Sequence, residues 1–179
     1  MKLTIALLAL SASSLSYSKT CHEIESRTAA HDFYATVETN RMFAVPTEIE
    51  LKKLKPYVTK SLFKLFSAAV SAEKNEFKRS KGKTPPLFEG HLFSGVVEGY
   101  TNFYISSGVP GKNGTEVYVL LQYAKHLLPY YFATPGILEW KERVEIKAEG
   151  ERCLLNNIYY TLETNNESLA NVLANIVTR

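Results

Sequence analysis

The sequence lacks the patterns that identify many enzymes and nucleic-acid-binding proteins. It contains no Gly-rich segment that matches a phosphate-binding template, no Ser-His-Asp order, and no His and Cys spacing typical of a metal site. Basic and acidic residues are nearly balanced, at 21 and 18, and the densest basic run, residues 78–83, lies beside Gly and Pro in a connection. Nucleic-acid binding needs positive charge clustered along one surface. We therefore expect no metal, no cofactor and no nucleic-acid partner.

Long apolar runs are missing as well. Residues 3–10 form an apolar stretch after the positively charged Lys2, but a transmembrane helix takes about 20 apolar residues. Ser16 and Ser18 place small residues at the positions that a signal peptidase reads. This three-part pattern is typical of a secretory signal peptide, and we predict cleavage after Ser18.

The predicted cleavage divides the chain into a signal peptide, residues 1–18, and a mature segment, residues 19–179. The mature segment has the length of a single domain that can bury its own core. It contains no stretch apolar enough to span a bilayer. We expect a periplasmic or secreted protein without stable membrane insertion.

Cysteine is scarce, because Cys21 and Cys153 are the only two in the chain. Two cysteines in an oxidising compartment usually pair. A redox pair would be expected as Cys-x-x-Cys, and His22 beside Cys21 is too little for a metal site. A lipid-anchored cysteine would need a small residue before it, whereas Lys19 and Thr20 precede Cys21. We predict a structural disulfide between Cys21 and Cys153.

The N-terminal half has the periodicity of helices. Thr47 and Glu50 have the spacing of a capping box, and Pro56 ends the short helix that follows. Either Thr59 or Ser61 can cap a longer helix. The apolar stripes expected on these elements are, in chain order, Ala30, Phe33, Tyr34 and Val37; then Ile49, Leu51 and Leu54; then Leu62, Phe63, Phe66, Ala69, Val70 and Phe77.

From residue 86 to 160 the pattern predicts strands and turns. Residues 100–106 and 117–123 are rich in residues that favour strands, and Asn113-Gly114 between them is a turn signal. They predict an antiparallel hairpin with a long connection.

A second hairpin begins at Trp140. Apolar residues at 140, 144 and 146 alternate with charged residues at 141, 143, 145 and 147, which is typical of a half-buried antiparallel strand. Glu149-Gly150 forms the turn. Residues 152–160 return, with one face predicted to carry Cys153, Leu155, Asn157 and Tyr159.

The chain ends in a predicted helix that Asn165 or Asn166 caps. Its apolar stripe is Leu169, Val172, Leu173 and Ile176. Helices, then antiparallel strands, then a closing helix predict an α+β fold. A curved sheet wrapped around the helices would bury the apolar face of each of these helices and strands.

A series of short motifs follows residue 86. It comprises Phe88-Glu89-Gly90-His91-Leu92-Phe93, Glu98-Gly99, Trp140 with Glu142, Val144 and Ile146, Gly150, Asn157-Ile158-x-Tyr160, and Leu169. In this order the motifs resemble an uncharacterised family of exported bacterial proteins, domain of unknown function 3828. The resemblance covers roughly residues 28–177. It implies a nuclear-transport-factor-like, or cystatin-like, cone, with N-terminal helices packed in a strongly curved antiparallel sheet.

The family implies no activity, and the chain departs from its pattern in the last strand. Cys153 stands near an aromatic position there, and Asn156 and Asn157 replace acidic residues. An acid–base role attached to those acids would not carry over to this chain.

Cone folds can hold small molecules on the concave face of the sheet. A general base there would be a buried carboxylate or His with a shifted pKa. The candidates are Glu98, His91 and His126, with Tyr100, Tyr104 and Tyr118 as possible hydrogen-bond donors. A buried Glu98 facing an apolar pocket would favour an enzyme, and a Glu98 in solvent would argue against one.

Aromatic residues suggest a binding surface instead. The chain has 11 Tyr, and such a composition suits either a binding face or a sheet-rich core. Residues 127–132 form an aromatic stretch that would either contact a partner or close the end of the cone. The candidate binding residues are Tyr104, Tyr118, Tyr130, Tyr131 and Trp140.

Two functions remain open at this level. The first is a non-enzymatic binding or interaction module whose partner is a small ligand or an envelope protein. A specific form of it is an immunity-type protein that blocks a toxin attacking the cell wall. The alternative is a small cone-fold enzyme, of isomerase or hydrolase type, that uses Glu98 or a His as general base.

Overall fold

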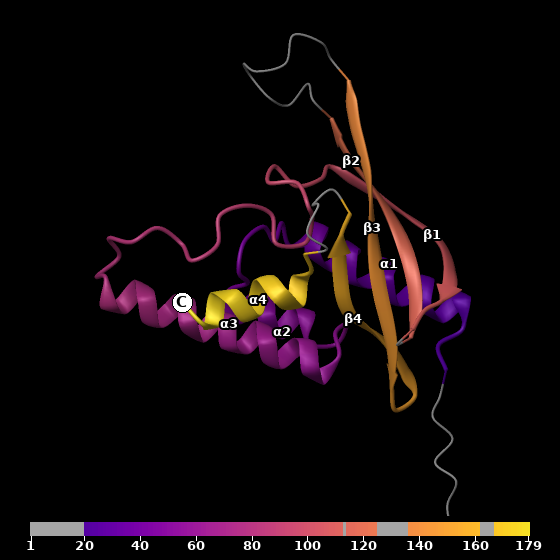
Figure 1. Cartoon of the computed structure of the whole chain (residues 1–179), viewed down its shortest axis with the longest axis horizontal. Coiled ribbons are helices and arrows are strands. Elements are labelled where there is room, and N and C mark those ends of the chain that lie inside the picture. Colours follow the sequence, from indigo (N-terminus) through magenta and orange to yellow (C-terminus); the bar gives the residue numbers. More distant parts are fainter. Residues whose placement is uncertain (1–19, 113, 125–135, 162–166) are drawn as a thin grey trace, which may run out of the picture.

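The computed structural model describes residues 20–112, 114–124, 136–161 and 167–179. The predicted signal peptide therefore lies outside the described residues. The elements in chain order are α1 (Glu23–Thr39), α2 (Glu48–Leu54), α3 (Lys60–Arg79), β1 (Asn102–Pro110), β2 (Thr115–Ala124), β3 (Ile137–Glu149), β4 (Arg152–Tyr160) and α4 (Leu169–Val177). This is the predicted α+β class, with helices beside an open antiparallel sheet (Figure 1).

The predicted helix starts at Thr47 and Thr59 are confirmed. The Glu50 N–H donates to Thr47 Oγ1, and the Glu50 carboxylate accepts from the Thr47 N–H at 2.7 Å. Thr59 accepts from the Leu62 N–H at 3.3 Å, so Thr59 rather than Ser61 caps α3. These side chains satisfy backbone donors that a helix start would otherwise leave free.

Two residues of the expected apolar stripes do not pack in the core. Phe77 is 66% exposed, because it lies in the last turn of α3, where its ring is next to Gly82 of the following loop instead of the core. Ile49 is also exposed. It is two positions from Leu51 on α2, and residues two apart do not share a helix face, whereas Leu51 and Leu54 do.

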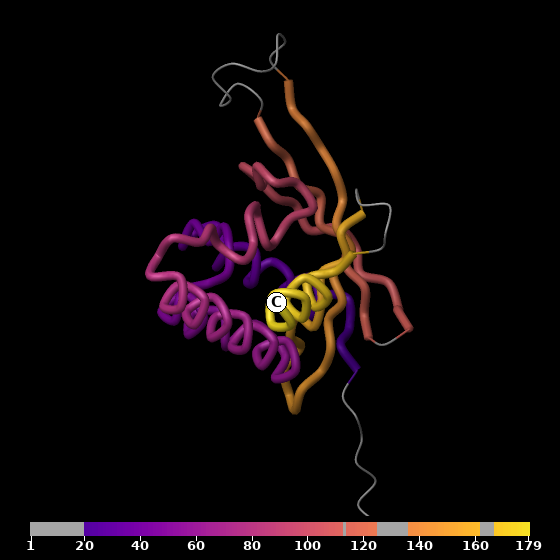
Figure 2. Tube along the Cα trace, turned by 60° about the vertical axis from the view of Figure 1, so that its left-hand side comes forward, coloured from indigo at the N-terminus to yellow at the C-terminus, as the bar shows by residue number. Residues whose placement is uncertain are grey.

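The sheet has the strand order β1-β2-β3-β4, and each strand runs antiparallel to its neighbour. The helices lie on one side of it (Figure 2). Residues in register point to the same face, so Val117, Val144 and Ile158 form one row against the helices. The helices contribute Phe33, Tyr34 and Phe66, among others, to the core that fills this side.

A bulge in β4 corrects the predicted face of that strand. Glu145 pairs with Asn157 and Ile146 with Leu155, so Asn156 is an extra residue in β4. One extra residue reverses the alternation. The side chains of Leu155, Ile158 and Tyr160 therefore point into the core, and Cys153, Leu155, Asn157 and Tyr159 do not share one face as predicted.

The last helix begins later than predicted. Ser168 is the N-cap of α4 and accepts from the Asn171 N–H, while Asn165 and Asn166 lie outside the described residues. The predicted stripe of α4 is buried. The first strand also shifts, from residues 100–106 to Asn102–Pro110, with an irregularity between Ile105 and Gly108.

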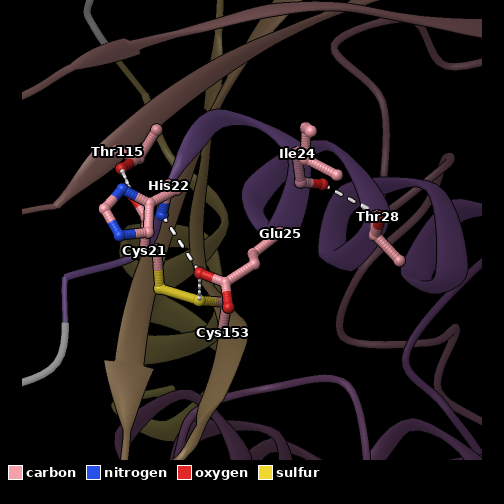
Figure 3. The surroundings of a disulfide bond; sticks show 7 residues. All are labelled: Cys21, His22, Ile24, Glu25, Thr28, Thr115 and Cys153. Atoms are coloured by element: carbon pink, nitrogen blue, oxygen red, sulfur yellow. Dashed lines mark hydrogen bonds between the residues drawn. A yellow bond between two sulfur atoms is a disulfide. The ribbon is translucent and has the colours of Figure 1, made fainter.

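The predicted disulfide between Cys21 and Cys153 is present, with the two Cα atoms 5.7 Å apart (Figure 3). It ties Cys21, two residues before α1, to the start of β4. The Thr115 hydroxyl donates to the Cys21 carbonyl oxygen at 2.7 Å, which joins the same point to the start of β2. The N-terminal end of α1 is thereby fixed against the sheet.

Candidate functional site on the open face of the sheet

Glu98 does not have the surroundings of a general base. It is exposed, next to the equally exposed Val97, in the loop before β1. It is not among the described residues that line the cavity beside His91, the groove between α1 and β1, or the pocket at the start of α3. A general base acts from a pocket that also holds the substrate, and the exposed side chain of Glu98 is not in such a pocket.

His91 and Tyr100 pack together inside the protein. His91 is 8% exposed, and its ring centroid lies 5.1 Å from the rings of both Phe43 and Tyr100. The Phe93 N–H donates to its Nδ1 at 3.3 Å, which favours the neutral ring. Burial lowers the pKa of His91 to about 4. For Tyr100 the same burial raises the pKa, because the charged form of a phenol is the deprotonated one. The Tyr100 hydroxyl has no hydrogen-bond partner among the described residues.

A small cavity of about 210 Å³ borders His91 on the side of α4. Gly90, Ser94, Tyr160 and Arg179 are among the other residues that line it. No charged group pairs with the His91 ring among the described residues. The geometry therefore places His91 in a packed setting that favours its neutral form.

Glu142 is a polar core residue that sequence reasoning missed as a site. It is fully buried and accepts hydrogen bonds from the Gly95 N–H at 2.9 Å, the Trp140 indole N–H at 3.1 Å and the Thr161 N–H at 3.1 Å. It also adds to the effect of burial in raising the pKa of Tyr34. The available signal was a charged residue between Trp140 and Val144 in the inward register of a strand.

Trp140, predicted as a binding residue, belongs to this core. Its side chain is 4% exposed, and its indole N–H is engaged by Glu142. Together Trp140 and Glu142 hold the loop containing Gly95 against β3. A Cβ at Gly95 would lie 2.9 Å from Glu142 Oε1, so the close approach of that loop requires glycine.

Tyr104 and Tyr118 lie on the opposite, outer face of the sheet. They are 51% and 36% exposed. Tyr104 is in register with Leu120, and Leu120 is two residues from Tyr118, so the three side chains share a face. No described helix covers this face (Figure 2).

The outer face continues from Tyr118 into an ordered row across three strands. Tyr118 is in register with Arg143, and Arg143 with Tyr159. The Arg143 guanidinium lies 3.8 Å from the centroid of the Tyr159 ring and pairs with Glu116 at 2.5 Å. Stacking and ion pairing together hold the long Arg143 side chain in one orientation.

The far end of the row is also fixed by polar contacts. The Tyr159 hydroxyl donates to Glu145 Oε2 at 2.9 Å, and the Lys147 ammonium lies 3.1 Å from Glu145 Oε1. Burial raises the pKa of Tyr159, and the Glu145 carboxylate adds to this rise. The hydroxyl therefore stays protonated at neutral pH and can donate.

At the sheet edge the outer face meets a groove of about 590 Å³ between α1 and β1. Tyr104 lines both, and the Asn102 amide donates to its hydroxyl at 2.9 Å. On the α1 side the groove is lined by Ile24, whose side chain is almost wholly exposed. An edge strand with apolar neighbours is a common contact point for partners.

His126, Tyr130, Tyr131 and the aromatic stretch 127–132 lie outside the described residues. Within the described ranges no cluster of His, Cys, Asp and Glu could hold a metal ion. No helix in the same ranges is long and apolar enough to cross a membrane.

Comparison of the chain with family models, with curated proteins and with solved structures gives no match in any of the three.

Proposed function

We propose that the protein is an exported, non-enzymatic interaction module that binds a protein partner on the outer face of its sheet. The observation that carries this proposal is the row Tyr118–Arg143–Tyr159, held rigid by Glu116 and Glu145 on a face that no described helix covers. Tyr and Arg dominate the energetics of protein interfaces. A side chain that is already ordered loses little entropy on binding.

The side of the sheet that faces the helices supports the same choice. There α1 places Phe33 and Tyr34 in the core, and both are fully buried. The space in which a cone fold would hold a small molecule is thus filled by the protein's own side chains. The outer face and the adjoining groove remain for contact with a partner.

The compartment and the finer fold are part of the proposal. The disulfide between Cys21 and Cys153 fits an oxidising compartment, and the N-terminal pattern fits export to the periplasm or medium. The helices on one side of the sheet fit a nuclear-transport-factor-like cone. In this setting an envelope protein is the expected partner, and an immunity-type role against a cell-wall toxin is one form of it.

Native mass spectrometry of the mature protein, purified gently from its own organism, tests the proposal. We expect a co-purifying protein with the wild type and its loss with Tyr118→Ser combined with Arg143→Ala. Phe77→Ser is the matched control, because it removes an exposed aromatic ring from α3 on the helix side. Retention of the partner by the double variant, or a bare wild-type monomer, would contradict the proposal.

A further inference from the structure

A second open pocket lies where α3 begins, beside the turn between β3 and β4. Its volume is about 570 Å³, which is within the range of small-molecule sites. Its apolar floor is formed by Val58 and Leu154, which are buried, and by the half-buried ring of Phe63. These three residues come from the segment before α3, from β4 and from α3.

The charged groups around this floor are mainly cations. They are Lys55, Lys60, Lys64 and Arg152, and Glu149 is the acid among the lining residues. The Lys55 ammonium lies 5.6 Å from the centroid of the Phe63 ring, which is a cation–π contact with the floor of the pocket. All four cations are exposed, and Lys60 and Lys64 are one helical turn apart on α3.

The Glu149 carboxylate already binds at the start of α3, beside this pocket. Its Oε1 accepts from the backbone N–H of Lys60 at 3.0 Å, in the first turn of α3. That turn contains no acidic residue of its own. A helix start carries partial positive charge, and the surrounding Lys side chains add to it. Glu149, at the turn between β3 and β4, is thus one negative charge among four positive side chains, so the pocket keeps an excess of positive charge.

We propose that this pocket binds a small amphiphilic carboxylate, that is, a molecule with a short hydrocarbon body and one anionic end. The body would cover the floor of Phe63, Val58 and Leu154, and the carboxylate would lie among the ammonium groups of Lys60 and Lys64. The combination of apolar floor and cationic rim selects against neutral or cationic amphiphiles. The lining of this pocket includes none of Tyr118, Arg143 and Tyr159, so the site does not depend on the interaction proposed for them.

Titration of the mature, oxidised protein with octanoate, followed by NMR or calorimetry, tests this inference. We expect octanoate to bind in the millimolar range with shifts centred on Phe63 and Leu154. Octylammonium lacks the negative charge and acetate lacks the body, so both should bind much more weakly. Equal binding of octanoate and octylammonium, or no binding of octanoate, would overturn the proposal.

Variants at the rim give opposite expected effects. Lys64→Glu should weaken octanoate binding roughly tenfold, since an attraction becomes a repulsion. Lys83→Glu makes the same change of charge beyond the other end of α3 and should leave binding unaltered. Glu149→Gln keeps an acceptor for the Lys60 N–H but removes the competing negative charge, so binding should tighten.

The gain in affinity with Glu149→Gln separates the proposal from mere loss of folding, which could only weaken binding. Unchanged affinity in both Lys64→Glu and Glu149→Gln would overturn it. An equal loss of affinity with Lys64→Glu and with Lys83→Glu would also overturn the proposal. Octanoate would then respond to the net charge of the protein and not to this pocket. Binding should weaken as salt is raised, since the rim is exposed.

Discussion

Gly95 and Glu142 are 47 residues apart, and a hydrogen bond of 2.9 Å joins the Gly95 N–H to Glu142 Oε1. The same carboxylate accepts from Thr161 just after β4. One buried side chain on β3 therefore holds the long loop before β1 and the end of the last strand. Among the described residues it is a carboxylate with no exposed surface, and its hydrogen bonds join three segments of the chain.

Replacement of Glu142 by Leu should strongly destabilise the protein. The N–H groups of Gly95, Trp140 and Thr161 would lose this acceptor, and the Trp140 indole N–H would be left without it inside the core, at a cost of about 3–5 kcal/mol in the free energy of unfolding. Urea denaturation measures the change.

Glu142→Gln is the control for size and shape. It keeps one oxygen acceptor, so it should cost roughly half as much as Leu. Equal stability of the wild type and the Leu variant would show that these hydrogen bonds do not hold the loop.

His91 should make stability depend on pH below neutrality. Its pKa falls from 6.5 to about 4 because it is buried. The folded state therefore favours the neutral ring, and its contribution is complete above pH 6.5. As the pH falls from 6.5 toward 4, the unfolded chain binds the proton first, and up to about 3 kcal/mol of stability is lost.

His91→Asn keeps an acceptor for the Phe93 N–H and removes the titration. The difference in unfolding free energy between this variant and the wild type should change across that pH window and be constant above it. A difference that does not vary with pH would mean that His91 titrates normally.

The disulfide should contribute much of the stability. It closes a loop with a sequence separation of 132, for which the chain-entropy model gives about 4–5 kcal/mol, as an upper value. The double variant Cys21→Ser, Cys153→Ser should unfold at a lower urea concentration than the oxidised wild type. Peptides from non-reduced protein should contain Cys21 linked to Cys153, and two free thiols in exported material would contradict the account.

Local patterns predicted much of the fold. The caps at Thr47 and Thr59 depend on residues three apart, and the inward positions of Trp140 and Val144 follow from strand alternation. The disulfide followed from cysteine number and compartment. Each of these features could be predicted without knowing which helices and strands lie next to one another in the fold.

The features that sequence reasoning missed depend on non-local pairing. The bulge at Asn156 reverses the face of β4, and nothing in that strand alone requires it. The outer row joins Tyr118, Arg143 and Tyr159 only once the registers of both strand pairs are known. Phe77 was expected to be buried from helical spacing, but it lies in the last turn of α3 and is 66% exposed.

The most direct test of the proposed interaction is site-specific photo-crosslinking in the protein's own organism. The aromatic crosslinker p-benzoylphenylalanine would replace Tyr118 on the outer face or, as control, Phe77 on α3, both exposed aromatic positions. The account predicts a covalent adduct with a single protein from position 118 and none from position 77. An adduct from position 77 alone, or from neither position, would contradict a partner on the outer face of the sheet.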